Sequence, residues 1–283
     1  MKPNIIFMGT PEFGAIVLKA LIKSGHKPFL VFTEPDKPVG RKQIITPPPV
    51  KALAEEYNIP VVQPEKVSQF ADEIEKLKPS LIIIASFGQI IPKKILEIPK
   101  DGCLNVHPSI LPKYRGPSPI QSAIINGDEK TGVTIMRVSE KIDAGPILSQ
   151  KEIEIDPKET YESLHDKLAE AGTKLLLEVL PNLSKGQVPF QLQDDSKATY
   201  TKILNRSDGE IDWKKSPEEI ERQIRAFNPW PGTFTFCNGK RLKILKAEAL
   251  YGKLKIKEVQ LEGKKPISYE EFLRGYPDFK LPC

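Results

Sequence analysis

The sequence predicts an α/β protein, with a mostly parallel sheet covered by helices and a smaller β-rich domain after it. Short aliphatic runs alternate with segments whose apolar residues recur at helical spacing, which is typical of parallel strands joined by crossover helices. The run Leu81–Ala85 is apolar throughout, as expected of a strand covered on both faces. Beyond Lys202 the pattern changes to one short helix and several strand-like runs, which indicates the second domain.

The expected elements of the first domain follow in order along the chain. Strands are expected at residues 4–8, 29–33, 61–62, 81–85, 102–104, 133–138 and 147–155, and helices at 11–24, 50–57, 70–77, 120–125 and 160–183. Thr10 is expected to cap the first helix, with Pro11 at its first position and Gly25 after its end. The spacing of Gly9 and Gly14 lacks the middle glycine of a dinucleotide fingerprint, and the Lys-Ser/Thr of a phosphate loop is also missing, which argues against a nicotinamide or ATP site.

The second domain begins with a helix start signal. Ser216-Pro217-Glu218-Glu219 has the form of a capping box with proline at the first helical position. Strands are expected at residues 233–236, 242–250 and 254–261.

Length, composition and net charge indicate what kind of protein this is. A chain of 283 residues is long enough for one large or two ordinary domains, and 39% hydrophobic with 28% charged residues is typical of a globular protein. The formal net charge of +5 is compatible with an acidic partner but does not require one.

Cysteine and histidine usage argues against metal sites and disulfides. Cys103, Cys237 and Cys283 lie far apart without C-x-x-C spacing, and the three histidines are scattered, so we expect neither a disulfide framework nor a metal. The first apolar run is too short for a signal peptide, and no run has membrane-spanning length. We therefore expect a cytoplasmic protein that does not enter the membrane.

One stretch, residues 105–119, points to chemistry. Asn105 and His107 follow the short apolar run Gly102-Cys103-Leu104. Side chains two residues apart on a strand point to the same side. An amide that donates and an imidazole that donates or accepts can together hold a carbonyl oxygen and take a proton. Asp143 lies downstream in a turn-like sequence, and a carboxylate near a neutral histidine commonly fixes its tautomer. The alternative is a structural role. A histidine at a strand end often only completes local hydrogen bonds, and Asn and Asp in loops often make turns.

The order of these residues favours the chemical interpretation. The sequence Asn105-Val-His-Pro-Ser-Ile-Leu-Pro112 and the later Asp143 resemble the folate-dependent formyltransferases, whose active-site motif ends in Ser-Leu-Leu-Pro and is completed by an aspartate. Ile110 replaces the first leucine of that motif. The resemblance extends over nearly the whole chain. It implies that Asn105, His107 and Asp143 are catalytic and that 10-formyltetrahydrofolate is the co-substrate, without a metal.

The resemblance also implies a folate pocket. The uncharged loop at residues 86–92 follows a strand end, where α/β sheets bind ligands, and its backbone can hold a flat ring, although a simple turn is the alternative. By resemblance this loop lines the pterin pocket, and the segment 138–143 forms its other wall. The expected folate-binding residues are Phe87, Gly88, Gln89, Ile90, Ile91, Ser109, Ile110, Leu111, Pro112, Val138 and Ile142.

Two further blocks resemble the branch of this family that acts on methionyl-tRNA. They are residues 225–232, Arg-Ala-Phe-Asn-Pro-Trp-Pro-Gly, and the continuation 119–121, Pro-Ile-Gln. The proline-rich stretch 34–49 is expected to be a loop. It matches the loop that reaches the tRNA acceptor end in that branch, with Arg41 at the position of the key arginine and Lys42 beside it, although a solvated surface loop is the alternative.

A basic surface is expected in the second domain. Residues 240–265 carry nine basic and three acidic side chains, among them Lys240, Arg241, Lys243 and Lys246. Such a surface suits an RNA phosphate backbone, and a lysine-rich edge that prevents aggregation is the alternative.

The resemblance implies a division into a Rossmann-like formyltransferase domain at residues 1–188, a linker at 189–205 and a reduced, oligonucleotide-binding-like (OB-like) domain for tRNA at 206–283. The second domain departs from the family, because the turn at Tyr251-Gly252-Lys253 replaces several strands and leaves too few to close a barrel. This shortening concerns the way tRNA is bound and leaves the formyl chemistry unaffected.

The resemblance thus implies a cytoplasmic, monomeric enzyme that formylates the α-amine of initiator methionyl-tRNA and supports translation initiation. One alternative is a formyltransferase for a small amine, such as glycinamide ribonucleotide or a nucleotide-linked amino sugar. Pro108 and the thin second domain favour that alternative, while the presence of a second domain opposes it. Another alternative is a relative that only binds tRNA or folate, which the intact catalytic residues oppose.

Overall fold

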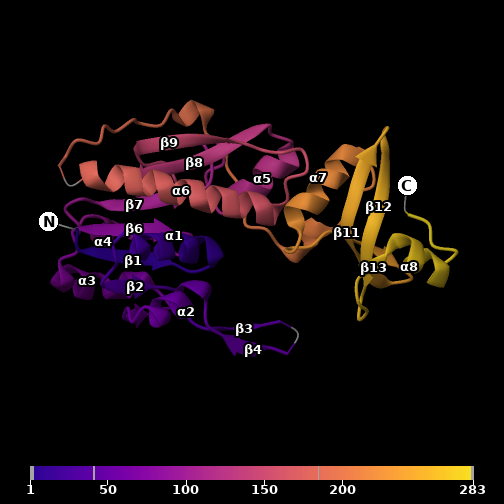
Figure 1. Cartoon of the computed structure of the whole chain (residues 1–283), viewed down its shortest axis with the longest axis horizontal. Coiled ribbons are helices and arrows are strands. Elements are labelled where there is room, and N and C mark those ends of the chain that lie inside the picture. Colours follow the sequence, from indigo (N-terminus) through magenta and orange to yellow (C-terminus); the bar gives the residue numbers. More distant parts are fainter. Residues whose placement is uncertain (1–2, 41, 184, 282–283) are drawn as a thin grey trace. The chain divides into compact units, whose positions relative to one another are not determined.

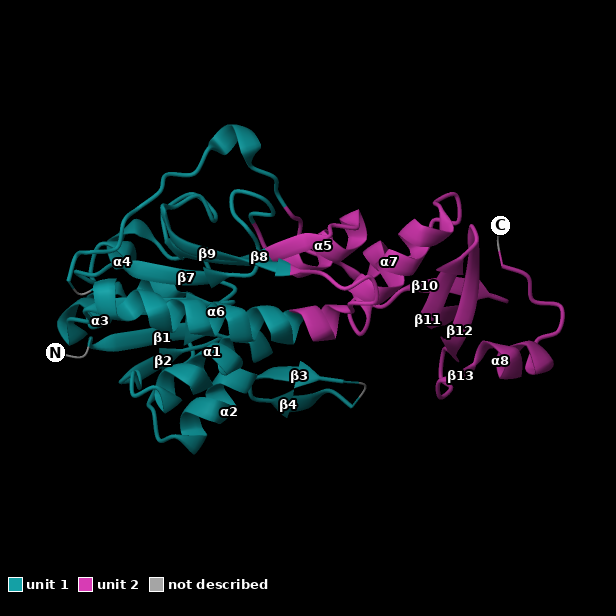
Figure 2. Ribbon diagram, turned by 45° about the horizontal axis from the view of Figure 1, so that its top comes forward, with its two compact units in different colours: residues 1–115, 132–153, 165–200 teal, residues 116–131, 154–164, 201–283 magenta. Residues whose placement is uncertain are grey.

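The computed structural model describes residues 3–40, 42–183 and 185–281, and the chain forms two compact units (Figure 2). Unit 1 contains residues 1–115, 132–153 and 165–200, and unit 2 contains residues 116–131, 154–164 and 201–283. The chain passes between the units several times. Helix α6 (Tyr161–Leu183) and strand β8 (Lys130–Arg137) therefore contribute residues to both units.

A seven-stranded sheet forms the centre of unit 1, in the order β5-β2-β1-β6-β7-β8-β9 (Figure 1). The first five strands in this order run parallel to one another, and β8 is antiparallel to β7. This arrangement confirms the predicted mostly parallel sheet. The strand bounds are β1 (Ile5–Gly9), β2 (Leu30–Phe32), β5 (Val61–Val62), β6 (Leu81–Ala85), β7 (Cys103–His107), β8 as above and β9 (Ile147–Glu154).

Helices cover both faces of this sheet. On one face Ile6 of β1 and Ile82 of β6 belong to a core cluster that includes Ile74 of α3 and Ile95 of α4. On the other face Val106 lies so close to α6 that only glycine fits at Gly172. The period of two along each strand thus divides the apolar residues between two layers. The helices of this unit besides α6 are α1 (Glu12–Lys23), α2 (Pro49–Glu56), the 3-10 helices η1 (Val67–Phe70) and η2 (Asp195–Lys197), α3 (Ala71–Leu77) and α4 (Lys93–Leu96).

The predicted cap of the first helix is wrong. Pro11 occupies the cap position and α1 begins at Glu12, while Gly25 adopts the expected left-handed conformation after the helix. The hydroxyl of Thr10 instead donates to the carbonyl of Phe87 at 3.0 Å and accepts from the backbone N–H of Glu34 at 3.3 Å. A hydroxyl that both donates and accepts can link three chain segments, so Thr10 ties the end of β1 to the loops after β2 and β6.

The stretch predicted as a loop contains a hairpin, β3 (Lys37–Val39) and β4 (Ile44–Thr46), whose strand residues are all exposed. Two three-residue strands with both faces in water show no alternation, so their pattern resembles a loop. Asp36 anchors the base of the hairpin, since its carboxylate accepts from Lys51 Nζ at 2.8 Å and from Gln63 Nε2 at 2.7 Å. These hydrogen bonds hold the pKa of Asp36 below its usual range, and the one from Lys51 has the larger effect. Arg41 lies outside the described residues.

Unit 2 contains a four-stranded sheet in the order β10-β11-β12-β13, antiparallel throughout. The predicted capping box is confirmed, because Ser216 Oγ accepts from the N–H of Glu219 and the Glu219 carboxylate accepts from the N–H of Ser216. Helix α7 packs Ile220 and Ile224 into a core with the sheet residue Leu242. The bounds are α5 (Pro119–Asn126), η3 (Arg206–Gly209), α7 (Pro217–Phe227), β10 (Phe234–Cys237), β11 (Lys240–Leu250), β12 (Lys253–Leu261), β13 (Ile267–Ser268) and α8 (Tyr269–Gly275).

No helix built from the described residues has the length and apolarity needed to cross a bilayer.

Cys103 should be unreactive in the folded protein. Its side chain is 1% exposed in the core of unit 1, and burial raises the pKa of its thiol to about 12. At pH 8 only about one thiol in 10,000 is then ionised. We expect peptide mass mapping to detect iodoacetamide adducts on Cys103 in urea but not under native conditions. Modification of Cys103 in the native state at the rate seen in urea would contradict this burial.

Candidate active site

Three side chains chosen from the sequence meet at the carboxyl end of β7. Asn105 and His107 point to the same side of the strand, and Asp143 approaches both. Asn105 Nδ2 lies 3.5 Å from Asp143 Oδ1, and His107 Nδ1 lies 3.7 Å from Asp143 Oδ2. His107 is only 4% exposed, so the imidazole and the carboxylate interact with little screening by water. The cluster combines a hydrogen-bond donor, a proton acceptor and a negative charge.

The hydrogen bonding of His107 determines its tautomer. His107 Nε2 lies 3.0 Å from the carbonyl oxygen of Tyr114. A carbonyl only accepts hydrogen bonds, so Nε2 carries a hydrogen in this geometry. Nδ1, on the side of Asp143, is then the nitrogen that can take up a proton. The sequence suggests that the Asp143 carboxylate fixes this tautomer, whereas in the structure the Tyr114 carbonyl is the group bonded to Nε2.

A tight loop directs Asp143 back toward β7. Asp143 has φ 47°, a left-handed conformation that is uncommon for residues other than glycine. A Cβ at Gly145 would lie 1.8 Å from the carbonyl oxygen of Arg137, so only glycine fits there. The N–H of Arg137 donates to the carbonyl of Pro146 at 2.9 Å and closes the base of the loop. A strained residue held by its surroundings is frequent at functional sites.

Gln193 contacts this loop and Arg115 contacts Gln193, and neither residue had a role predicted from the sequence. Gln193 Nε2 donates to the carbonyls of Asp143 at 2.8 Å and Gly145 at 2.7 Å. Its Oε1 accepts from Arg115, whose side chain is 1% exposed. Arg115 lies within residues 105–119, but no local sequence pattern pairs it with Gln193, which is 78 positions away.

The loop after β6 contains both structural and exposed residues. Phe87 is 2% exposed and Ile91 is 7% exposed, and both belong to the core. The side chain of Gln89 accepts from the N–H of Val67 at 2.7 Å and donates to the carbonyl of Pro64 at 3.0 Å, so it holds the loop in place. Gly88 has φ 85°, and the side chain of Ile90 is 78% exposed. The exposed residues of this loop, Ser86, Gly88 and Ile90, are therefore all uncharged.

The remaining residues predicted to bind folate are mostly buried or half-buried. Ser109 is fully buried, and its hydroxyl donates to the carbonyl of Lys113 at 2.6 Å. Leu111 packs with Met136 and Val138. Ile110 is half-buried beside Gly132, and the Pro112 carbonyl accepts a hydrogen bond from the N–H of Thr199. The side chain of Ile142, next to Asp143 in the sequence, is 60% exposed.

The predicted basic residues fall into distinct environments. Lys42 is exposed in the turn between β3 and β4. On β11, Lys240 is exposed and Lys243 is half-buried. The Arg241 guanidinium lies 4.1 Å from the centre of the Phe234 ring, and Lys246 Nζ lies 3.0 Å from a Glu258 carboxylate oxygen. Arg241 and Lys246 thus have protein partners of their own.

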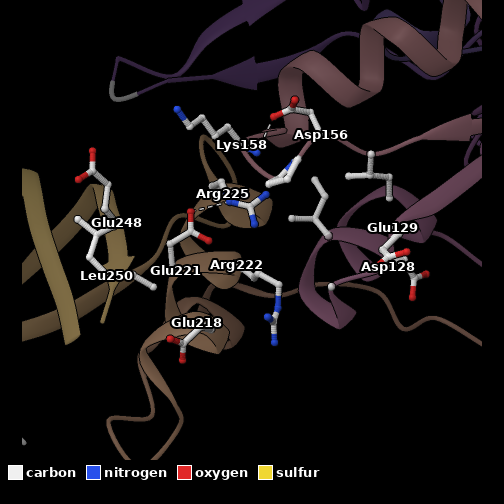
Figure 3. Close-up of a pocket in the computed structure, with 15 residues that line it drawn as sticks. Asp128, Glu129, Asp156, Lys158, Glu218, Glu221, Arg222, Arg225, Glu248 and Leu250 are labelled. Carbon is white, nitrogen blue, oxygen red and sulfur yellow. Dashed lines mark hydrogen bonds and ion pairs between the residues drawn. The ribbon is translucent and has the colours of Figure 1, made fainter. Parts of the chain in front are cut away.

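A pocket of about 630 Å³ lies within unit 2 (Figure 3). Helix α7 and the tip of the β11–β12 hairpin contribute to its lining, together with residues 124–129 and 155–158. The lining has six carboxylates and three basic side chains, and Arg225 Nε donates to Glu221 at 2.6 Å. An acidic lining does not suit a phosphate group, and none of the predicted site residues lines this pocket. Within the described ranges, no group of three or more potential ligands could hold a metal ion.

Comparison with known families identifies related sequences. The profile of the family described as "Formyl transferase" matches residues 1–180. The profile described as "Formyl transferase, C-terminal domain" matches residues 203–253. The first match contains Asn105, His107 and Asp143, and the second contains β11.

Individual relatives agree with the profiles. A sugar 3N-formyl transferase, solved with dTDP and 5-N-formyl-THF, has the same fold, with a TM-score of 0.68 at 23% identity over 95% of this chain and 97% of that chain. A methionyl-tRNA formyltransferase from Bacillus velezensis is 47% identical over 96% of this chain and 94% of its own length. The enzyme of the same name from Halalkalibacterium halodurans is 46% identical with the same coverage. The chain therefore belongs to the formyl transferase family, among the methionyl-tRNA formyltransferases.

Proposed function

We propose that this protein transfers the formyl group of 10-formyltetrahydrofolate to the α-amino group of initiator methionyl-tRNA and so supports translation initiation. The observation that carries this proposal is the cluster of Asn105, His107 and Asp143 at the end of β7, in a chain of this family. We assign the formyl chemistry to residues 1–188 and tRNA binding to residues 206–283, connected by 189–205. We propose that the enzyme acts in the cytoplasm as a monomer.

The three side chains divide the chemistry between them. As the amine nitrogen bonds to the formyl carbon, negative charge develops on the formyl oxygen, and the Asn105 amide donates a hydrogen bond to it. His107 takes the amine proton at Nδ1, because its Nε2–H is held by the Tyr114 carbonyl. The Asp143 carboxylate, 3.7 Å from Nδ1, stabilises the resulting imidazolium, directly or through a water. The oxyanion then collapses and the bond from the formyl carbon to the folate nitrogen breaks. That nitrogen takes the proton from His107, so neutral tetrahydrofolate leaves and His107 returns to its starting state.

Several features of unit 1 suit a folate. The loop after β6 carries no charged side chain, and Gly88 leaves its backbone accessible to a flat ring. Ile90 and Ile142 are exposed apolar side chains at the two segments expected to form the pocket walls. The solved sugar formyl transferase contains a formyl-tetrahydrofolate, which supports the same class of co-substrate for this fold.

Lys240 and Lys243 are proposed to contact RNA phosphates. Replacing both by alanine should raise KM for methionyl-tRNA and leave kcat at saturating tRNA unchanged, because phosphate contacts bind without taking part in the chemistry. The slope of log(kcat/KM) against log salt concentration should become shallower by about one for each lysine. Lys76→Ala on α3 is the control, since this lysine is exposed but has no proposed role. An unchanged salt slope in the double variant would exclude β11 from the RNA interface.

The direct test is transfer of labelled formyl from 10-formyltetrahydrofolate to three acceptors in parallel: methionyl-tRNA, glycinamide ribonucleotide and a nucleotide-linked amino sugar. We expect transfer to the tRNA alone. Transfer to only a small amine would overturn the tRNA assignment and keep the chemistry of Asn105, His107 and Asp143. Binding of tRNA or folate without any transfer would reject the enzymatic proposal.

A further inference from the structure

A chain of hydrogen bonds leads from a buried cation to the loop of Asp143. Arg115 donates to Gln193 Oε1 through Nε at 3.1 Å and Nη2 at 2.8 Å. It also donates to Asp195 Oδ1 at 2.7 Å and to Tyr200 Oη at 3.2 Å. These contacts balance the charge of a side chain that is 1% exposed and fix its position. All of these groups belong to unit 1.

The guanidinium determines the orientation of the Gln193 amide. A guanidinium only donates hydrogen bonds, so the amide oxygen must face Arg115. The amide nitrogen must then face the carbonyls of Asp143 and Gly145, which only accept. The opposite orientation would place donor against donor and acceptor against acceptor. Gln193 is thus held in one orientation with both of its N–H groups on the loop that carries Asp143.

The segment around Gln193 also holds the other partner of His107. The N–H of Tyr114 donates to Thr199 Oγ1 at 2.8 Å, and the N–H of Arg115 donates to the Thr199 carbonyl at 2.9 Å. Tyr114 has φ 62°, left-handed like Asp143, and its carbonyl is the group bonded to His107. One short segment therefore fixes two strained positions on either side of the same imidazole.

We propose that Gln193, oriented by Arg115, is a positioning residue that holds the Asp143 carboxylate against His107 and Asn105. Residues 193–199, in the stretch expected to be a linker, thereby form part of the support of the active site. This inference rests on the proposed formyl transfer, because the role of Asp143 belongs to that proposal. Gln193 acts through the backbone of Asp143 and Gly145 and does not contact the reacting atoms.

The first test is Gln193→Glu. A carboxylate of the same shape still accepts from Arg115 but cannot donate to the two carbonyls. We expect kcat to fall by about 10- to 100-fold while KM for both substrates changes by less than about 3-fold, the pattern of a lost transition-state interaction. Gln191→Glu is the matched control, with the same charge change on an exposed side chain two residues earlier. Gln193→Met, which is uncharged and of similar length, also removes the two N–H donors and should show the same loss of kcat. This variant serves as the test if the glutamate variant folds poorly.

A double-mutant cycle separates positioning from general destabilisation. If Gln193 acts through Asp143, the change Gln193→Glu should cost less than about 3-fold in a protein that already carries Asp143→Asn. General destabilisation would instead multiply the two losses. An equal loss from Gln193→Glu in both backgrounds would overturn the proposal.

A readout without catalysis makes failure of this inference distinguishable from failure of the proposed function. In protein labelled with ¹⁵N-histidine, the ring nitrogen signals of His107 should move in Gln193→Glu and stay in place in Gln191→Glu. Absence of formyl transfer by the unaltered protein would reject the function and leave this measurement valid. Unchanged His107 signals in Gln193→Glu would overturn the positioning role, whether or not the protein is active.

Discussion

Replacing Asn105 by alanine should lower kcat by about 100- to 1,000-fold, which is the usual cost of removing one donor to a developing oxyanion. The amide is the donor proposed for the formyl oxygen, and the truncated side chain leaves that oxygen without it. KM for both substrates should change by less than about 3-fold, because the interaction strengthens only in the transition state. Steady-state and single-turnover formylation assays measure both quantities.

Val106→Ala is the matched control for this change. Val106 occupies the next position on β7 but packs on the opposite face, against α6. Its truncation should lower the free energy of unfolding by about 1 to 3 kcal/mol and leave kcat nearly unchanged. Asn105→Ala should show the reverse pattern. A loss of kcat smaller than about 10-fold in Asn105→Ala would remove Asn105 from the proposed mechanism.

Replacing His107 by glutamine should lower kcat by about 100- to 10,000-fold, the range for a group that transfers a proton in the transition state. The glutamine amide retains a donor for the Tyr114 carbonyl and so preserves much of the local hydrogen bonding. It cannot take up a proton near neutral pH, so the amine loses its proton acceptor. Single-turnover formylation at saturating substrates isolates this step.

His165→Gln is the control for the loss of a buried histidine. His165 is 8% exposed and lies edge-on to Phe13, with ring centroids 5.6 Å apart. It takes no part in the proposed reaction, so its replacement should affect stability more than kcat. Retention of kcat within about 10-fold in His107→Gln, or an equal loss in both variants, would contradict proton transfer by His107.

Secondary structure was predictable wherever a local pattern produced it. The strand Leu81–Ala85 and the helix Tyr161–Leu183 match the apolar run and the helical spacing seen in the sequence. The capping box at Ser216 was also predictable, since its two partners lie three residues apart. The hairpin at Lys37–Thr46 was missed because its strands are short and exposed on both faces. The cap at Thr10 was wrong because tertiary hydrogen bonds use the hydroxyl.

The cluster of proposed catalytic residues was predictable only in part. Asn105 and His107 could be paired from the sequence, because strand geometry alone places side chains two apart on one side. Their approach to Asp143 depends on a loop that begins after an antiparallel strand and is closed by Gly145. The tautomer of His107 depends on a carbonyl seven residues later, and main-chain acceptors carry no signature in a sequence.

The sequence alone was sufficient for the fold class and the family, and it singled out three side chains that the structure brings together, because each of these depends on local spacing or on a short string of residues. Tertiary structure decided how Asp143 reaches His107 and which groups hold it there. Arg115 and Gln193 are 78 positions apart, and their hydrogen bonds exist only after the chain has folded back on itself. Burial then makes these contacts strong and specific, because an unpaired charge or amide has no water to replace its partner.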